Sequence, residues 1–413
     1  MPGWLRIAAR TLLLMACLFA LIRSLRIGWA DALARSGDTA KITRAIAVEP
    51  RNEIWPAQLA LRRLQDGESS PELRAELERC YQRRPSDSNL LMALGLLAEQ
   101  NGNNSAAEDY LLHAAKLDHT FKPAWTLANF YFRIGSTQLM WPQLRRCLDL
   151  IEPRNPYGRS FDPTPVFALA WQAAEDPKAI LAVLPPRREI ILPYLAFLTT
   201  RPGTTKRNPI LLGADAWPLA LQLADPADRD ILFGFLDQLA AESPAESAAR
   251  FWNDLIDRGY LPAFGAAGKL NSAAGRLLAD PDFNAPPFEH GFGWRVLFEP
   301  GINSSLTRHA LSLEFTGGEK EHAIPVSTYA AVQPHKTYRL QWMYDGVPPK
   351  SLRAVLGDED SGVVQTCRVD SCTFTVPEGV YVLPLRLRYD RPAGEMRLRG
   401  EYIIRSVRME EVR

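Results

Sequence analysis

Residues 86–153 of the chain read SDSNLLMALGLLAEQNGNNSAAEDYLLHAAKLDHTFKPAWTLANFYFRIGSTQLMWPQLRRCLDLIEP. They contain two consecutive segments that share one length and one pattern. The first segment has apolar or small residues at Leu91, Leu94, Gly95 and Ala98, and then at Ala107, Leu111 and Ala114. The second has Trp125, Ala128, Asn129 and Phe132, each 34 residues further on. A repeat of this length predicts stacked helical hairpins.

The small residues explain how each hairpin closes. Gly95 and Ala107 allow two antiparallel helices to approach closely, and Leu94 and Leu111 fill the layers beside them. The sequence Asn-Gly-Asn at 101–103 is typical of a turn, because these residues accept left-handed backbone angles. A single hairpin cannot bury its apolar face alone, so several must stack.

The pattern resembles the tetratricopeptide repeat family, whose first helix carries a tryptophan-leucine-glycine-tyrosine signature. The matching pairs are Leu91 and Trp125, Leu94 and Ala128, Gly95 and Asn129, and Ala98 and Phe132. The second helix of the second copy departs from the signature, with Trp141 and Arg145 where the first copy has Ala107 and Leu111. The resemblance implies a superhelix whose groove binds an extended partner, with Trp125, Asn129 and Phe132 near that groove. The alternative is that Trp125 and Phe132 are the core of their own repeat.

The N-terminus carries an apolar run, residues 12–22, preceded by Arg6 and Arg10. This pattern is typical of a membrane helix or a secretory signal. A lipoprotein signal ending at Cys17 and an ordinary buried first helix are alternatives. We expect residues 1–29 to be an uncleaved signal-anchor with the bulk of the chain exported. Arg23 and Arg26 after the run oppose that orientation, because positive charge prefers the cytoplasmic side.

Three further regions follow the anchor before the C-terminal third. We expect tetratricopeptide-like repeats over residues 30–155 and further helical pairs over residues 156–262. Residues 263–276 contain many glycine, alanine and serine residues, which is typical of a linker.

The apolar period changes from helical to two in residues 277–413. Tyr338, Leu340 and Trp342 alternate with polar residues, which is typical of half-buried antiparallel strands. The sequence therefore predicts a β-sandwich of about eight strands. The stretches Asp282-Phe283-Asn284 and Gly293-Trp294 resemble the entry strand of jelly-roll domains of the carbohydrate-binding-module type, although the usual Asn-Gly pair is missing.

Sugar rings stack on aromatic side chains, so Trp294, Trp342 and Tyr344 are candidates for a glycan contact. The alternative is that both tryptophans fill the sandwich core. Asp280 and Asp282 are weaker candidates for a structural calcium site, since paired acids in a turn are more often solvated. If their strands are neighbours, four arginines form a basic stripe that would suit a polyanionic glycan or a lipid headgroup surface: Arg386, Arg388, Arg397 and Arg399.

Cys367 and Cys372 bracket four residues of a predicted hairpin and could form a disulfide in an oxidising compartment. The sequence shows no catalytic motif, no metal-ligand spacing and no cofactor fingerprint. The 413 residues carry a net charge of +1, which argues against nucleic-acid binding.

These features together predict an inner-membrane, single-pass scaffold that is not an enzyme, with its bulk in the periplasm. Its helical-repeat groove would bind a protein partner and its sandwich a glycan. The combination resembles exported tetratricopeptide proteins of bacterial surface-polysaccharide systems, which implies a role in exopolysaccharide or O-antigen assembly. The alternatives are a polysaccharide-processing enzyme with its site in the sandwich and a cytoplasmic adaptor.

Overall fold

The computed structural model describes residues 3–151, 162–174, 178–201, 209–241, 246–307, 309–346, 349–357, 365–368 and 371–412. It comprises two compact units, Met1–Pro185 and Pro186–Arg413. The described elements of the first unit are all helices, and the second begins with helices and ends with two antiparallel sheets. The predicted fold class, a helical-repeat region followed by a β-sandwich, is confirmed. The predicted boundary between residues 155 and 156 lies outside the described residues.

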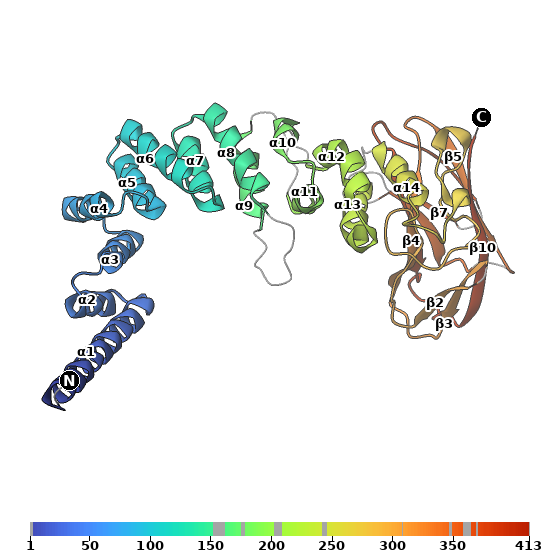
Figure 1. Cartoon of the computed structure of the whole chain (residues 1–413). Helices are drawn as coiled ribbons and strands as arrows, with labels where there is room; N and C mark the ends of the chain where they lie inside the picture. The colour runs from blue at the N-terminus through green and yellow to red at the C-terminus, as the bar shows by residue number, and fades with distance from the viewer. Residues whose placement is uncertain are drawn as a thin grey trace. The chain divides into compact units, whose positions relative to one another are not determined.

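The first unit is a series of helical hairpins (Figure 1). Its helices are α1 (Gly3–Arg35), α2 (Thr39–Val48), α3 (Ile54–Gln65), α4 (Pro71–Arg83), α5 (Ser88–Gln100), α6 (Asn104–Leu117), α7 (Phe121–Arg133), α8 (Thr137–Asp149), α9 (Thr164–Ala173) and α10 (Lys178–Val183). Each of the pairs α1/α2, α3/α4, α5/α6 and α7/α8 packs together. We name α3, α5 and α7, which are the first helices of three hairpins, the A helices.

The same local devices begin and end these helices in successive repeats. The side chains of Asp87 and Asn103 accept hydrogen bonds from the first-turn amides of α5 and α6. Gly67, Gly102 and Gly135 follow the three A helices and have left-handed backbone angles. A glycine adopts such angles without steric cost, so each A helix stops and the chain reverses.

Small residues bring α5 and α6 together as the sequence predicted. A Cβ atom added to Gly95 would lie only 2.8 Å from side-chain atoms of Leu111 and 3.3 Å from the carbonyl oxygen of Ala107. Leu111 and Ala107 are fully buried. The hairpin therefore depends on the absence of a side chain at residue 95.

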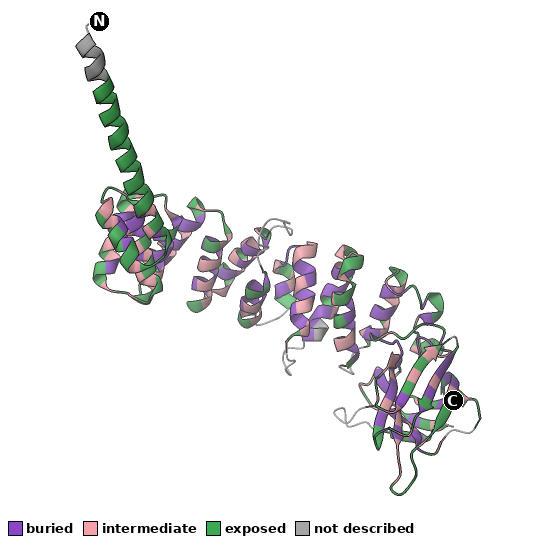
Figure 2. Ribbon diagram, turned by 90° about the horizontal axis from the view of Figure 1, so that it is seen from below, coloured by how far each residue is buried: buried purple, intermediate pink, exposed green. Residues whose placement is uncertain are grey.

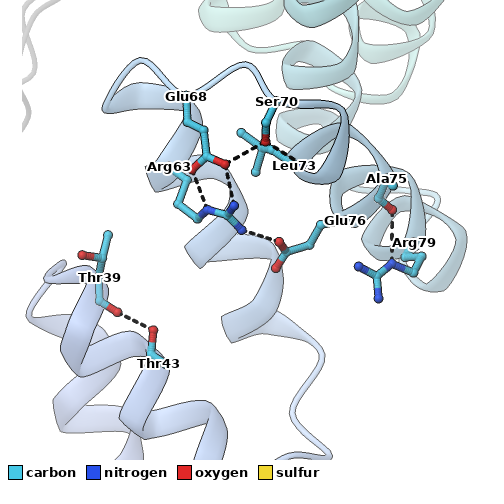
Figure 3. A network of polar contacts seen from close by, with 9 residues as sticks. All are labelled: Thr39, Thr43, Arg63, Glu68, Ser70, Leu73, Ala75, Glu76 and Arg79. Atoms are coloured by element: carbon cyan, nitrogen blue, oxygen red, sulfur yellow. Dashed lines mark hydrogen bonds and ion pairs between the residues drawn. The ribbon is translucent and has the colours of Figure 1, made fainter.

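A polar network joins the hairpin of α3 and α4 (Figure 3). The guanidinium group of Arg63 donates to both carboxylate oxygens of Glu68 and to Glu76. Ser70, the N-cap of α4, also donates to Glu68, at 2.8 Å. The hydrogen bond from Arg63 lowers the pKa of Glu68 below its usual value, so this carboxylate stays charged in mildly acidic solution.

The described residues of the second unit begin with four helices and a 3-10 turn. These are α11 (Arg188–Thr199), α12 (Pro209–Leu223), η1 (Pro226–Asp228), α13 (Arg229–Ala241) and α14 (Ser247–Asp257). Asp237 on α13 accepts hydrogen bonds from the amide of Gly291 and from Arg295, and it contacts His290 at 2.6 Å. This carboxylate ties α13 to the chain that enters the sandwich.

Residues 263–276, for which the sequence predicted a linker, belong to the second unit. They contain the 3-10 turns η2 (Ala266–Gly268) and η3 (Ser272–Ala274). Trp252 and Asn253 of α14 hydrogen-bond to the backbone of Gly268 and Leu270. These bonds fix the segment to α14.

Among the described residues of the second unit, ten strands form two five-stranded antiparallel sheets, with orders β1-β4-β9-β6-β7 and β2-β3-β10-β5-β8. The strands are β1 (Arg295–Val296), β2 (Ile302–Thr307), β3 (Ala310–Phe315), β4 (His322–Ala331), β5 (Thr337–Tyr344), β6 (Leu352–Leu356), β7 (Gln365–Arg368), β8 (Cys372–Thr375), β9 (Val382–Asp390) and β10 (Gly400–Glu411). Strands that occupy the same place in the two orders are consecutive in the chain and are joined directly: β1 with β2, β4 with β3, β9 with β10, β6 with β5, and β7 with β8. Strands β3 to β10 have the order of a jelly roll, and β1 and β2 extend its two sheets by one strand each.

The strand register places all five of these direct connections at one end of the sandwich. One hydrophobic core lies between the sheets and includes Val326 and Leu385 from one sheet and Leu313 and Trp342 from the other. Cys367 in β7 and Cys372 in β8 are disulfide-bonded, with their Cα atoms 5.5 Å apart. Because β7 and β8 are edge strands of different sheets, this bond links the two sheets at one margin.

Candidate functional site

The A helices stack in register along the first unit. Thr126 contacts the sulfur of Met92, and Arg133 donates twice to the carboxylate of Glu99, at 2.6 and 2.7 Å. In both pairs the partners are 34 residues apart, so equivalent positions of α5 and α7 touch. Lys122 adds a third contact, to the side-chain oxygen of Asn89 at 2.9 Å. The sequence period is therefore also a contact period in space.

The contacts between α5 and α7, extended to α3 by the same 34-residue spacing, define one surface, which we name the A-helix face. It runs across α3, α5 and α7 and consists of Gln58, Arg62, Gln65, Asn89, Met92, Leu96, Glu99, Lys122, Thr126 and Arg133. Most of these side chains are exposed or half-buried, and Met92 is buried. Arg62 pairs with Asp66, and Arg133 pairs with Glu99, so the charges of the face largely neutralise one another. What remains available is a set of amide, hydroxyl and charged groups that can hydrogen-bond to a polypeptide backbone.

The residues predicted for the groove lie on another side of α7. By the 34-residue register, Trp125, Asn129 and Phe132 are equivalent to Leu91, Gly95 and Ala98. The latter three are buried, and Gly95 directly faces α6. The predicted groove residues therefore lie on the side of α7 that faces its partner helix α8, apart from the A-helix face.

Local contacts agree with this position. The side-chain amide of Asn129 donates to the carbonyl oxygen of Trp125 at 2.8 Å, and the Trp125 ring stacks on Phe121. Trp125 and Phe132 remain half-buried. The Trp125 ring thus packs on a residue of its own helix.

In the sandwich, the predicted aromatic platform is part of the core. Trp294 and Trp342 are only 3% and 2% exposed, and their rings pack edge to face with centroids 6.1 Å apart. Tyr344 is half-buried and packs against the same core. Trp342 and Tyr344 share the inward side of β5 with Tyr338 and Leu340, so their rings are not presented to a ligand on the outer face.

The two acidic residues proposed for calcium also have structural partners. Asp280 accepts hydrogen bonds from the amides of Asn284 and Ala285, both at 2.8 Å, and so holds the entry turn. Asp282 pairs with Arg408 at 2.7 Å. Within the described residues, no group of three histidine, cysteine or acidic side chains is arranged to hold a metal ion.

The four arginines of the predicted stripe are divided between two places. Arg386 and Arg388 lie on β9, whereas Arg397 and Arg399 lie in the connection from β9 to β10. Arg397 donates to the carbonyl oxygen of Gly317 at 3.0 Å. The stripe as predicted is therefore not one surface, because β9 and β10 belong to different sheets.

The first helix combines an unpacked and a packed part. Figure 2 shows the described beginning of α1 as exposed along its length. Nine large apolar side chains there are 56–68% exposed: Leu12, Leu13, Leu14, Met15, Leu18, Phe19, Leu21, Ile22 and Leu25. Further along the same helix, Ala30 and Ala34 are buried with Ile42, Ala45 and Trp55. Within the described residues, Arg10–Arg35 is the one segment long and apolar enough to cross a membrane, and a signal sequence has the same properties.

A shallow cavity lies where the two parts of α1 meet. It has a volume of about 380 Å³ and is lined by Phe19, Ile22, Arg23, Arg26 and residues 49–51. Arg26 pairs with Glu49 at 3.3 Å. Arg23 and Arg26 thus lie at the end of the exposed apolar surface of α1.

No family model matches the chain. Among solved structures, the chain is similar to YrrB, a tetratricopeptide protein with an unusual peptide-binding site, at 13% identity, with 52% of this chain and 91% of that chain covered and a TM-score of 0.27. It is also similar to the C-terminal part of a tetratricopeptide protein from Cytophaga hutchinsonii, at 13% identity, 56% and 94% coverage and a TM-score of 0.32. A third similar structure is yeast Tom70, at 17% identity, 58% and 53% coverage and a TM-score of 0.29. These similarities fall on the helical part of the chain, while the β-sandwich is not identified with a carbohydrate-binding module.

Proposed function

We propose that this protein is a membrane-anchored, non-catalytic scaffold that binds an extended segment of a protein partner on its A-helix face. The observation that carries the proposal is the contact period of 34 residues between α5 and α7. This period places equivalent side chains next to one another on neighbouring helices. A surface built from such repeats suits a partner that is itself extended.

The exposed part of α1 supports membrane anchoring. Leu12, Leu13, Leu14 and Met15 are consecutive, so they point to all sides of the helix. A helix that is apolar all round is stable only when it is covered. The part of α1 that precedes Arg23 begins at Gly3 and spans about 30 Å, which matches the hydrocarbon core of a typical bilayer. A lipid bilayer would cover this surface.

We propose that the bulk of the chain is exported to the periplasm from a single inner-membrane span. The disulfide between Cys367 and Cys372 supports export, because cytosolic thiols are kept reduced. Arg23 and Arg26 argue for the opposite orientation. A fusion of alkaline phosphatase after Gly67 distinguishes the two orientations, because alkaline phosphatase is active only when it is exported. An inactive fusion at normal protein level would favour a cytoplasmic adaptor.

The A-helix face is tested by photo-crosslinking in intact membranes. A photoreactive amino acid at Gln58 or Thr126 is expected to give a protein adduct. The matched control is Asp109, which is exposed on α6. Equal adducts from all three positions would contradict the proposed face.

We further propose that the sandwich binds glycan, in a system that assembles exopolysaccharide or O-antigen. The core position of Trp294 and Trp342 means that this binding requires a surface other than an aromatic platform. Glycan turnover by the purified protein would favour a polysaccharide-processing enzyme instead.

A further inference from the structure

Three arginines stand side by side on three neighbouring strands of one sheet. Arg353 on β6 is directly opposite Arg388 on β9 and directly opposite Arg368 on β7. Their neighbours in sequence, Ala354, Leu387 and Cys367, are buried in the core. Because side chains alternate along a strand, the three arginines share the outer face of the sheet.

A fourth arginine extends this group along β9. Arg386 is two residues from Arg388 and lies opposite Val355 and Ser327. Neighbouring strands are about 4.8 Å apart, and residues two apart on one strand are separated by roughly 7 Å. We name Arg353, Arg368, Arg386 and Arg388 the arginine surface.

The arginine surface has few internal counter-charges. Asp390 pairs with Arg388 at 2.7 Å and also contacts His322 at 2.8 Å. Within the described residues, Arg353, Arg368 and Arg386 make no ion pair. Like charges directly opposite one another on a sheet are destabilising. This arrangement costs stability in the free protein and would be relieved by an external anion.

The outer face of the other sheet shows the contrast. Arg405 pairs there with Asp345, and Arg408 pairs with Asp282. Arg339 on that face makes no ion pair within the described residues but lies directly opposite Glu410. By contrast, the register places no acidic residue opposite Arg353, Arg368 or Arg386 among the described strands.

We propose that the arginine surface binds an anionic polysaccharide, through carboxylate, sulfate or phosphate groups spaced along the chain. The inference rests on the proposed glycan role of the sandwich. It specifies where the glycan binds and that the glycan is negatively charged. Guanidinium groups recognise such oxyanions by paired hydrogen bonds. The spacing between strands is close to the length of one sugar along an extended chain, and Ser327 and Thr366 on the same face can hydrogen-bond to sugar hydroxyls.

A lipid surface fits this face less well. Proteins that lie on a membrane combine basic side chains with apolar ones that enter the bilayer. The outward neighbours of the arginines are Ser327, Thr366 and the buried Val355. The most exposed apolar side chains of the sandwich, Phe298 and Met396, lie instead in connections at one end, 93% and 92% exposed.

The test uses the full-length protein in detergent micelles and measures binding to three soluble polymers: a polyuronate, dextran sulfate and neutral dextran. The double variant Arg353→Gln/Arg368→Gln removes two charges of the arginine surface. The matched control, Arg339→Gln/Arg408→Gln, removes two arginines from exposed positions on the other sheet. We expect binding to an anionic polymer that weakens with salt. The arginine-surface variant should bind about tenfold more weakly, and the control should change less than about twofold.

Thermal unfolding separates loss of the site from loss of the fold. Removing like charges that face each other should leave the melting temperature of Arg353→Gln/Arg368→Gln unchanged or higher. If the double variant both melts at a lower temperature and binds more weakly, its weaker binding is explained by loss of the fold. The single variant Arg386→Gln is then measured. If it unfolds at the parent temperature and binds as strongly as the parent, the proposal is wrong.

The remaining outcomes each overturn a defined part. Equal loss in both double variants overturns the arginine surface and leaves glycan binding in place. Equal binding of neutral dextran overturns the anionic ligand but keeps the glycan role. Binding to none of the polymers overturns both the inference and the glycan role. Arginine-dependent binding to anionic vesicles without polymer binding would make the surface a membrane contact.

Discussion

At the scale of single residues, Gly95 controls how closely α5 and α6 approach. A Cβ at this position would lie 2.8 Å from Leu111, which is fully buried and cannot move into solvent. We expect Gly95→Ala to destabilise the first unit by about 1–2 kcal/mol, because overpacking outweighs the better helix propensity of alanine. Urea unfolding followed by the helical circular dichroism signal measures this change.

The matched control is Gly234 in α13, which would have open space around an added Cβ. There the propensity gain acts alone, so Gly234→Ala is expected to stabilise its helix by up to about 1 kcal/mol. If both substitutions stabilise the protein, the close approach at Gly95 does not limit packing.

Asp118 predicts a pH dependence of the joint between α6 and α7. Its carboxylate accepts hydrogen bonds from the amide of Thr120 and the hydroxyl of Ser88, both at 2.9 Å. The bond from Thr120, with that from Ser88, lowers the pKa of Asp118 below 3.8. A lowered pKa in the folded state means that the stabilisation is complete above pH 3.8 and is lost as the pH falls through the folded-state pKa.

We therefore expect Asp118→Asn to be less stable than the parent at neutral pH, by about 1 kcal/mol, and the difference to shrink in stronger acid. Urea unfolding across this pH range measures it. Asp109→Asn, at an exposed position of α6, is the control. A difference that stays constant with pH would show that the carboxylate charge of Asp118 is not involved.

Single residues also show what the sequence could and could not predict. Trp342 is on the same side of its strand as Tyr338 and Leu340, because the three residues are spaced two apart. This spacing already favours a place in the core over a glycan contact. Trp125 was harder to place, because the tetratricopeptide signature names its position but not the neighbouring helix that it faces. The cross-contacts of Lys122, Thr126 and Arg133 identify the A-helix face, and the 34-residue spacing to Asn89, Met92 and Glu99 was the signal that could have found it.

At the scale of elements, the disulfide links β7 and β8, the edge strands of opposite sheets. The loop that it closes is short, so the bond is expected to stabilise the sandwich by about 2 kcal/mol through the unfolded state. A reductant should lower the melting temperature of the sandwich in the parent but not in Cys367→Ser/Cys372→Ser.

The other cysteines provide an internal check on that experiment. Cys80 and Cys147 are buried in the helical unit, and burial raises the pKa of the Cys147 thiol to about 12. A reductant should therefore leave the helical transition unchanged. A shift of the helical transition alone would contradict the assignment of the redox effect to β7 and β8.

Strand order was the part of the sandwich that the sequence pattern could not supply. Alternation predicts that a strand is half-buried, yet it does not say that β9 lies beside β6, which comes 30 residues earlier. The arginine surface exists only through that pairing. Arg386 and Arg388 were visible as a pair on one strand, whereas Arg353 and Arg368 join them through the register of three strands.

At the scale of the whole molecule, the proposed function gives α1 two roles, as the membrane segment and as the first helix of the array. A protein that lacks residues 1–28 should be soluble without detergent and keep its helical transition, because the buried Ala30 and Ala34 remain. A protein that lacks residues 1–38 loses these contacts and should be less stable by at least about 2 kcal/mol.

Tryptophan fluorescence distinguishes the two truncated proteins. Trp55 is buried in the cluster that contains Ala30 and Ala34, so the longer truncation should expose it and shift its emission to the red. If both truncated proteins are equally stable, the end of α1 is not part of the repeat array. The residues Ala32-Leu33-Ala34 have the small-x-small pattern of a signal cleavage site. Cleavage after Ala34 would produce a protein close to the longer truncation, so an intact N-terminus in membranes is expected.

The continuity of α1 also has a rotational consequence. An α-helix turns by about 100° for each residue, so the number of residues between the apolar surface and Ala30 sets the direction in which the first hairpin points around the helix axis. Inserting one residue after Leu25 would swing the array about its anchor by that angle. Inserting seven would return it to within about 20° of the original direction and raise it further from the bilayer. In the proposed anchored arrangement, the phase of α1 would thus determine which side of the array faces partners in the plane of the membrane.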